Sequence, residues 1–367
     1  MNIFLPNMRT TEILPELERI LNSGWIGLGP EVTKFEESIC SYVSSQYATT
    51  TSSCSTALQI SLRCLALEPG SKIATTPVTF VSTNHSILNE GHIPVFVDVN
   101  PLTGNITPSS LMQALSNPPD LKCLFLVHLA GYPCDIDEIE KICKESGVVI
   151  IEDCAHAFGA SYKGRMIGDC DNMCCWSFQA VKNLPVGDGG AVTTKNKHLD
   201  TMLKKLRWMG IDKDTISRAQ SGYKWDYDVT DVGYKCFMND ITAAIGNVQI
   251  KYVTQDNARR KQIADYYRDN IRNAKKPEYH NDRQSSYHFY PVFFDNKEKV
   301  YNGLVDNGIH PGMHYKLNTR YRMYSNSITT GDMSGALEYE RTQLTLPIHT
   351  KLSDNDVERV VSIVNGL

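Results

Sequence analysis

KCLFLVHLAGYPCDIDEIEKICKESGVVIIEDCAHAFGA, residues 122–160, decides the fold class. Apolar runs at 122–131 and 148–160 read as strands. The segment between them, DIDEIEKICKESG (135–147), has apolar residues at helical spacing. A strand, a helix and a second strand in this order form a βαβ unit, in which the strands run parallel. The sequence therefore predicts an α/β protein with a mainly parallel sheet.

The same alternation continues on both sides of this unit. KIATTPVTF (72–80) and IPVFVDVN (93–100) read as strands around the helix STNHSILNEG (82–91), and SSCSTAL (52–58) opens an apolar helix after a short polar turn. Two further strands follow at MCCWSFQ (173–179) and GGAVTT (189–194). Ligands collect at the carboxyl ends of such strands. The positions to examine are therefore Thr79–Phe80, His128, 153–156 and 177–182.

The two ends of the chain differ from this middle part. Residues 1–50 read as helical with a Gly/Pro break at GWIGLGPE (24–31), and 238–271 reads as one long, bent helix. The last hundred residues mix one strand with helices. We expect an N-terminal arm and a large α/β domain over 1–240. The long connecting helix and a small α+β domain then occupy 241–367.

Composition excludes several classes of protein. The 367 residues carry a formal charge of −4 and no extended Lys/Arg run, which argues against a nucleic-acid partner. No stretch approaches the roughly 18 apolar residues of a membrane span. The opening residues lack the features of a signal peptide, so we expect a cytoplasmic protein. Of eleven scattered cysteines, only Cys170, Cys174 and Cys175 cluster, without the partner pair that zinc requires, so no metal site is predicted.

Lys182 is unusual in its surroundings. It lies in WSFQAVKNLPVGDGGAVTT (176–194), and no other charge occurs within five residues on either side of it. A lysine in apolar company shifts its pKa readily and often takes part in amine chemistry. The alternative is a lysine at a strand end that extends its amine into solvent.

Three further features stand at strand ends or helix starts. The helix that SSCSTAL opens offers free N–H groups and hydroxyls to a phosphate, although Ser and Thr are also ordinary helix caps. Asp153 ends a buried strand, where a carboxylate needs a cationic partner unless it caps a helix. Phe80 can stack on a flat ring or belong to the core. Together with Lys182 they indicate pyridoxal 5'-phosphate (PLP), whose aldehyde binds a lysine and whose ring nitrogen pairs with a carboxylate.

Motifs along nearly the whole chain are similar to those of a known family. They are SGWIGLGPEVTKFEE, IIEDCAHAFGASYKGRMIG, SFQAVKNLPVGDGGAVTT, VGYKCFMNDITAAIGNVQI and LPIHTKLSDNDV. The chain resembles the DegT/DnrJ/EryC1/StrS family of PLP-dependent nucleotide-sugar aminotransferases, which have fold type I. The resemblance implies a mixed, mainly parallel seven-stranded sheet between helices and a homodimer with active sites at the subunit interface. It also implies a cytoplasmic aminotransferase that moves an amino group from an amino acid, L-glutamate in most members, to a keto carbon.

The resemblance also assigns roles to matching residues. Lys182 would bind PLP covalently and move the proton, Asp153 would pair with the ring nitrogen, and His156 would lie at the ring. Phe80 would stack on the ring, and Ser177, Cys54 and Ser55 would hold the phosphate. Substrate contacts would come from Trp25, His314, Tyr315 and Arg320, with Arg322 and His288 as further candidates.

Two segments depart from the family pattern and leave alternatives open. Ser53-Cys54-Ser55 replaces Asn-Gly-Thr, and Lys235 stands where relatives have an Asn that reaches the phosphate in the neighbouring subunit. Lys235 could replace that Asn, contact a substrate phosphate or remain solvated. The acceptor is expected to be a nucleotide-linked keto-deoxy sugar aminated at C4 or C3. The alternatives are a keto-cyclitol or phosphorylated ketone, a sugar dehydratase of the same fold, against which Lys182 argues, or a non-catalytic regulatory protein.

Overall fold

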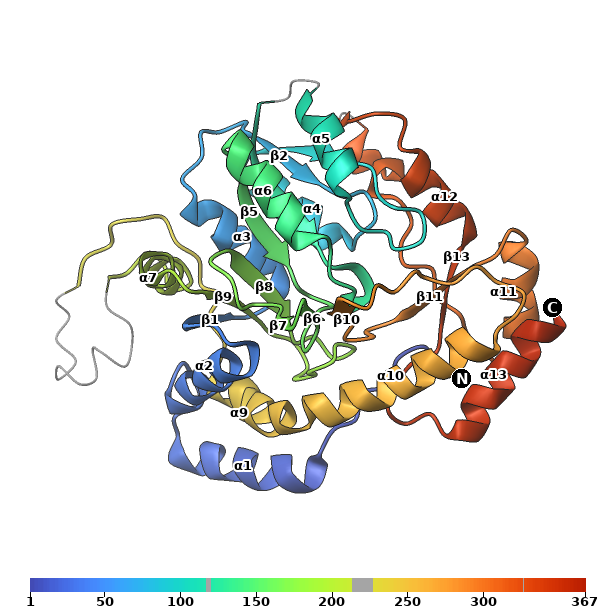
Figure 1. Ribbon diagram of the computed structural model, residues 1–367. Coiled ribbons are helices and arrows are strands. Elements are labelled where there is room, and N and C mark those ends of the chain that lie inside the picture. Colours follow the sequence, from blue (N-terminus) through green and yellow to red (C-terminus); the bar gives the residue numbers. More distant parts are fainter. Residues whose placement is uncertain (117–119, 213–226, 326) are drawn as a thin grey trace.

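The computed structural model describes residues 1–116, 120–212, 227–325 and 327–367. An eight-stranded sheet in the order β1-β9-β8-β5-β4-β2-β3-β12 forms its centre (Figure 1). Its strands are β1 (Tyr47–Thr51), β2 (Lys72–Thr75), β3 (Ile93–Phe96), β4 (Leu121–Val127), β5 (Val149–Asp153), β8 (Met173–Ser177), β9 (Gly190–Thr194) and β12 (Ile328–Thr329). The sequence also predicts a polar, irregular stretch that ends at about residue 235, and the middle of this stretch lies outside the described residues.

The predicted α/β class and mainly parallel sheet are confirmed. β12, β3, β2, β4, β5 and β8 pair in parallel, and β9 and β1 close one edge in antiparallel pairing. Seven strands come from the first 194 residues, and the two-residue β12 from the C-terminal part adds an eighth. In the register of β5 against β8, Glu152 lies opposite Cys174 and Asp153 opposite Cys175.

One prediction along the sheet is wrong. The sequence predicts helix up to residue 50 and a polar turn before Ser52, but 47–51 form β1, whose three Thr residues are fully buried. β-branched threonine suits a strand, and its hydroxyl is tolerated in the interior when it finds a partner. Thr49 donates to Asp200 at 2.8 Å.

Helices cover both faces of the sheet (Figure 1). α3 packs on β5, β8 and β9 and also contacts α4 and α7, whereas α6 lies on the other face and packs against β5 and α5. α2 packs on α9 and β1. The helices of the large part are α1 (Thr10–Ser23), α2 (Pro30–Val43), α3 (Cys54–Cys64), α4 (Val81–Asn89), α5 (Pro108–Ser116), α6 (Ile136–Ser146) and α7 (Lys197–Leu206).

The long, bent helix predicted over 238–271 is present as three consecutive segments. They are α9 (Asp240–Gln249), the 3₁₀ turn η2 (Ile250–Tyr252) and α10 (Val253–Asn270). This rod runs along the base of the molecule in Figure 1 and ends beside α13 (Asp354–Gly366). The change to 3₁₀ geometry at η2 is a common cause of such a bend.

The C-terminal part contains a two-stranded sheet with helices beside it. Its elements are β11 (Tyr290–Phe293), α11 (Lys297–Asp306), α12 (Ser334–Thr342) and β13 (Gln343–Leu346), with β11 antiparallel to β13. A three-stranded sheet joins this part to the large one through β6 (Ser161–Tyr162), β7 (Arg165–Met166) and β10 (Arg283–Gln284). The arm before α1 returns to this region, where the Ile3 carbonyl accepts from the N–H of Ile348. One apolar cluster holds residues of both parts, so the domain boundary at 240 stays a prediction.

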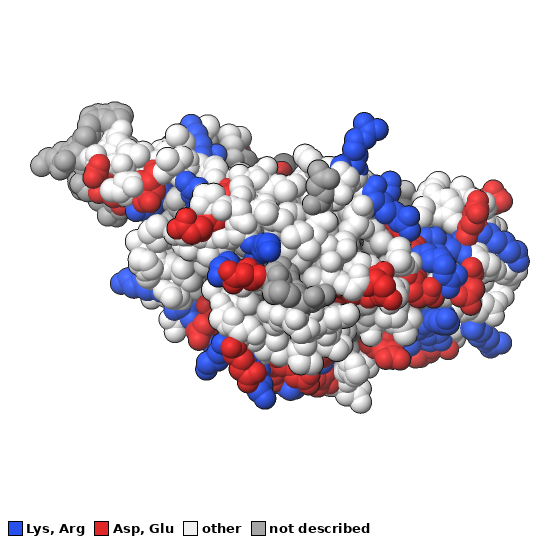
Figure 2. All heavy atoms as spheres, turned by 90° about the horizontal axis from the view of Figure 1, so that it is seen from above, with Lys and Arg blue, Asp and Glu red and all other residues white. Residues whose placement is uncertain are grey.

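Acidic and basic side chains are interspersed on the face that Figure 2 shows, mostly towards its margins. Among the described helices, none combines the length and the apolar character that crossing a membrane requires.

Candidate active site

The site is built at the carboxyl end of β5. Asp153 is its last residue and is 4% exposed. Its Oδ2 accepts from the Thr83 hydroxyl at 2.7 Å and its Oδ1 from the N–H of Ala155 at 3.1 Å. Burial nevertheless raises the pKa of this carboxyl above its ordinary value. Asp153 forms no ion pair with any described residue, and the charge of Lys182 opposes this rise only weakly, so the carboxylate is buried without a directly bonded cation.

Lys182 lies in the loop that joins β8 to β9. The N–H groups of Phe178, Ala180 and Val186 bond to carbonyls across this loop, and Gly187 at its turn has a φ of 107°, which favours glycine. The side chain makes no hydrogen bond or ion pair with another described residue. Burial lowers the pKa of Lys182 to about 8, and the nearby Cys54 and Asp153 oppose that shift. The sheltered lysine of the sequence is therefore a poorly solvated amine close to Asp153.

His156 lies three residues beyond Asp153 in a stack of rings. Its ring is 4.4 Å from that of His288 with an interplanar angle of 23°, and its Nε2 is 3.3 Å from the hydroxyl of Tyr315. Its Nδ1 is buried and has no hydrogen-bond partner. Burial, with a smaller contribution from the Lys182 ammonium, holds the pKa of His156 well below its ordinary value, so the ring is neutral at pH 7.

Two of the predicted substrate residues belong to the same cluster. The His314 ring is 5.0 Å from Tyr315 and its Nδ1 is 2.8 Å from the Thr345 hydroxyl. Burial lowers the pKa of His314 to about 4, and Lys182 adds to the effect. Phe80 lies 6.3 Å from the Tyr315 ring and is 57% exposed, which is unusual for a large apolar side chain at the N-terminus of α4. His314, Tyr315 and Phe80 therefore line the same side of the site.

The predicted phosphate residues meet at the N-terminus of α3. Ser53 caps this helix by accepting from the N–H of Thr56, so the first N–H groups, those of Cys54 and Ser55, have no partner within the helix. Gly190, the partner of Ser177 between β8 and β9, packs directly on this turn. A Cβ there would lie 2.6 Å from the Cys54 nitrogen. The glycine thus brings Ser177 and the helix N-terminus together.

Three predicted residues lie away from this cluster within the chain. The Trp25 indole donates to the Leu28 carbonyl at 3.1 Å, and Arg320 on η3 (Asn318–Arg320) pairs with Glu340. Lys235 is exposed, with its Nζ 5.9 Å from the Trp208 ring. None of the three forms a hydrogen bond, ion pair or ring contact with a described residue of the Lys182 cluster, so their assigned roles stay predictions.

The sequence did not reveal several residues that hold the site residues in place through hydrogen bonds and ring stacking. The Asn183 amide, next to Lys182, donates to Asn257 and to the Ser286 carbonyl, both at 2.7 Å, and its oxygen is 3.1 Å from Nδ1 of His288. Phe4 of the N-terminal arm stacks on His288 at 5.1 Å. No motif marks Thr83 or Phe4, because their partners are distant in sequence. Asn183 lies next to Lys182 in the motif at 176–194, but its residue type alone does not indicate a supporting role.

The unpaired groups of this site fit PLP. The cluster offers a poorly solvated amine, a buried carboxylate without a cation, an unpartnered His156 Nδ1 and free N–H groups at the start of α3. These are suited in turn to the aldehyde, the ring nitrogen, a polar atom of the ring and the phosphate. Fold and site together define a PLP-dependent enzyme of fold type I.

A family model named the DegT/DnrJ/EryC1/StrS aminotransferase family matches residues 7–365, and the chain belongs to this family. It is 32% identical to the spore coat polysaccharide biosynthesis protein SpsC of Bacillus subtilis, over 97% of this chain and 94% of that protein. The sugar aminotransferase CalS13 of Micromonospora echinospora superposes with a TM-score of 0.91 at 26% identity, covering 99% of each chain.

Spr1654 of Streptococcus pneumoniae has been solved in PMP and PLP forms. The PMP form superposes with a TM-score of 0.91 at 28% identity over 99% of this chain and 98% of that one. The protein is thus a PLP-dependent aminotransferase of a family of sugar aminotransferases. The predicted family, fold type, enzyme class and cofactor are confirmed.

Proposed function

We propose that the protein transfers the amino group of L-glutamate to C4 or C3 of a nucleotide-linked keto-deoxy sugar in a two-step, ping-pong reaction. The observation that carries this proposal is the set formed by Lys182, Asp153 and His156, whose unpaired groups fit the cofactor of a transaminase. The sugar class is supported by the names of two relatives, a polysaccharide biosynthesis protein and a sugar aminotransferase.

Lys182 supplies the base in this proposal. PLP, when bound, supplies an aldehyde and a ring that stabilises negative charge on the substrate carbon. Once released from the aldehyde, the Nζ of Lys182 would take the proton from that carbon and deliver it to the cofactor. With a pKa of about 8, roughly one amine in ten is neutral at pH 7, whereas an ordinary lysine is almost wholly charged.

Asp153 and His156 hold the geometry for this proton transfer. The Asp153 carboxylate is fixed by Thr83 and Ala155 and would stabilise a positive charge on the ring nitrogen of bound PLP. His156 is neutral and its Nε2 is fixed at the Tyr315 hydroxyl, so its Nδ1 is the nitrogen that faces a ligand.

The nucleotide is assigned to the loop that carries Tyr315. Arg320 is neutralised by Glu340, whereas Arg322 on η4 (Arg322–Tyr324) is exposed and forms no ion pair with a described residue. A guanidinium fork suits phosphate oxygens. We therefore assign the diphosphate first to Arg322, and to Arg320 only where the Glu340 pair opens. Trp25 stays a candidate to flank the sugar.

We also propose a cytoplasmic homodimer in which Lys235 reaches the phosphate in the partner subunit. Lys235 is exposed, and two strongly exposed apolar residues, Val229 at 56% and Val232 at 75%, lie just before it. Apolar side chains gathered on one surface segment suit a covered interface.

Single-turnover spectroscopy tests the substrate class. L-glutamate should convert the purified holoenzyme to its amine form, and a nucleotide-linked 4-keto-6-deoxy or 3-keto sugar should restore the original spectrum. A phosphorylated ketone without a nucleotide is the matched control and should leave the amine form unchanged. Restoration by that ketone but by no nucleotide sugar would contradict the proposed acceptor.

A further inference from the structure

A second group of reactive side chains lies on the opposite face of β5 from Asp153. Successive residues of a strand point to opposite faces. Glu152 and Cys154 therefore face away from Asp153, and Cys174, the register partner of Glu152, shares their side. The apolar clusters agree: Cys154 and Cys174 pack in one, and Cys175 packs in the cluster under α3. The loop before β8 adds Cys170 to this group.

The distances within this group suit one metal ion. The Cys170 sulfur is 3.4 Å from the Cys174 sulfur and 3.4 Å from Oε1 of Glu152. In a tetrahedral zinc site, two thiolate sulfurs lie about 3.8 Å apart, and a sulfur and a carboxylate oxygen lie about 3.6 Å apart, given zinc–ligand distances of about 2.3 and 2.1 Å. These two distances thus differ from the tetrahedral values by a few tenths of an ångström, and all three ligand atoms lie within 4.8 Å of one another.

The Glu152 carboxylate is already oriented for this role. The N–H of Cys134 donates to Nδ1 of His128 at 3.2 Å, so Nε2 of His128 carries its hydrogen and donates to Oε2 of Glu152 at 2.9 Å. The Asn172 amide donates to Oε1 at 2.8 Å. His128 and Asn172 fix the carboxylate, and Oε1 is left on the thiol side. Hydrogen bonds of this kind orient metal ligands in protein sites.

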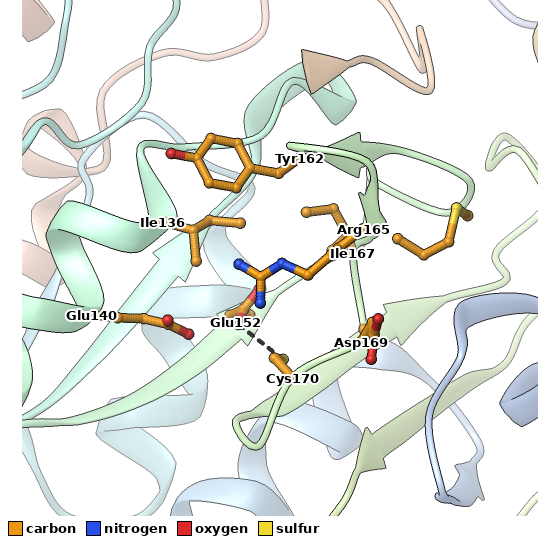
Figure 3. Close-up of a pocket in the computed structure, with 10 residues that line it drawn as sticks. Ile136, Glu140, Glu152, Tyr162, Arg165, Ile167, Asp169 and Cys170 are labelled. Atoms are coloured by element: carbon orange, nitrogen blue, oxygen red, sulfur yellow. Dashed lines mark hydrogen bonds between the residues drawn. The ribbon is translucent and has the colours of Figure 1, made fainter. Parts of the chain in front are cut away.

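The group is reached from solvent through a small pocket. Ile136, Glu140, Tyr162, Arg165 and Gly168 line it together with Glu152 and Cys170. Figure 3 shows Cys170 and Glu152 joined at its floor, with the guanidinium of Arg165 above them and Glu140 to one side. Cys170 is the only half-buried member among Glu152, Cys170 and Cys174. The pocket therefore offers an entry path and room for water as a fourth ligand.

We propose that Cys170, Cys174 and Glu152 form a binding site for a thiophilic divalent cation of the zinc class, on the face of β5 opposite the PLP site. Two sulfurs and one carboxylate are ligands that Zn²⁺ accepts, whereas Mg²⁺ and Ca²⁺ require oxygen. The bound ion would tie the loop at Cys170 to the centre of the sheet. The spacing of the cysteines could not reveal this site, because Glu152 comes from another strand.

Equilibrium dialysis of the holoenzyme against Zn²⁺ tests this site, with Cys170→Ser and Cys174→Ser as the test variants. Cys64→Ser removes a half-buried thiol elsewhere on the chain and is the matched control. Wild type and Cys64→Ser should each bind one equivalent, and both test variants should bind at least about tenfold more weakly. The visible band of PLP and the thermal midpoint without metal show that each variant is folded.

Two results would overturn the proposal. One is equal Zn²⁺ affinity in wild type and Cys170→Ser, including the absence of binding in both. The other is a Cys170–Cys174 disulfide in the protein purified under reducing conditions and alkylated at once, seen by peptide mass spectrometry. That bond would consume both thiols by two-electron oxidation, and it requires the sulfurs to close from 3.4 Å to about 2.05 Å.

Discussion

The two adjacent carboxylates of β5, Glu152 and Asp153, are equally buried but are treated in opposite ways by the chain. Burial disfavours the charged form of Glu152, but hydrogen bonds from His128, Asn172 and Cys170 outweigh this effect, so the pKa of Glu152 is lowered. Asp153 receives two hydrogen bonds, and burial still raises its pKa. The charge of Glu152 is stabilised within the fold, whereas that of Asp153 awaits a cation from outside. This difference separates a structural carboxylate from a cofactor-binding one.

The largest expected effect is that of Asp153→Asn. The amide keeps the shape but cannot stabilise a positive ring nitrogen, so we expect kcat/KM to fall about 10³-fold. The free energy of unfolding without cofactor should change by less than about 1 kcal/mol. The hydrogen bonds from Thr83 and Ala155 become weaker, but a buried charge that the fold compensates poorly is removed at the same time. Steady-state kinetics and urea unfolding measure both. A fall in kcat/KM of less than about tenfold would contradict the role of Asp153 at the ring nitrogen.

Glu152→Gln should show the reverse pattern. Losing the charge weakens three hydrogen bonds, so the free energy of unfolding should fall by about 2 kcal/mol, while kcat stays within about twofold. Urea unfolding and kinetics on one preparation measure both. An activity loss as large as that of Asp153→Asn, in folded protein, would erase the contrast between the two residues.

The pH dependence of stability sharpens the same contrast in cofactor-free protein. Glu152 has a lowered pKa, so its stabilisation is present above the ordinary carboxyl pKa of 4.5 and is lost as the pH falls through the folded value. Asp153 has a raised pKa, so its contribution declines as the pH rises from 3.8 through the folded value. The free energy of unfolding should be measured by urea between about pH 3.5 and 7. As the pH rises, wild type should become more stable relative to Glu152→Gln and less stable relative to Asp153→Asn. Parallel curves for the two variants would contradict these assignments.

Two arginines extend the comparison to the substrate loop. Arg322→Ala should raise KM for the nucleotide sugar about tenfold with little change in kcat, because an unpaired guanidinium binds the phosphates in all states alike. Arg320→Ala, which removes a group already neutralised by Glu340, should change KM by less than about threefold. Initial-rate kinetics measure both KM values. A larger increase in KM for Arg320→Ala than for Arg322→Ala would assign the diphosphate to Arg320 instead.

The smallest expected effect concerns Lys235. If it crosses the interface, Lys235→Ala should weaken PLP binding by about three- to tenfold, since one exposed charge contact is lost. Lys144→Ala, an exposed lysine on α6, is the matched control. Titration of apoenzyme with PLP measures both affinities. Equal affinities in the two variants would leave Lys235 as a solvated side chain.

The sequence predicted the parallel sheet and the chemistry at its strand ends because both depend on local patterns. Apolar runs and helical spacing define β4, α6 and β5, and Asp153 and Lys182 end or follow strands. It did not predict β1, because a run of threonines looks like a polar turn, whereas β-branched threonine also suits a buried strand. Nor did it reveal Thr83, Asn183 or Phe4, whose partners are brought together only by the sheet crossover and the returning N-terminal arm.

The pairing of Glu152 with the cysteines was hidden for the same reason. Cys170 and Cys174 are four residues apart in sequence, but their carboxylate comes from a strand about twenty residues earlier, through the register of β5 with β8. Similarly, the ion pair that occupies Arg320 depends on α12, which no motif marked. Local pattern thus identifies which residues carry chemistry, and tertiary contacts decide which of them remain free for it.

We propose that Lys182 is the amine that binds PLP. Borohydride reduction of the holoenzyme, followed by digestion and peptide mass spectrometry, tests it directly. We predict a single pyridoxyl modification, on Lys182, which disappears when L-glutamate is added before reduction and in Lys182→Ala. A modification on another lysine, or none in protein that holds PLP, would contradict the account.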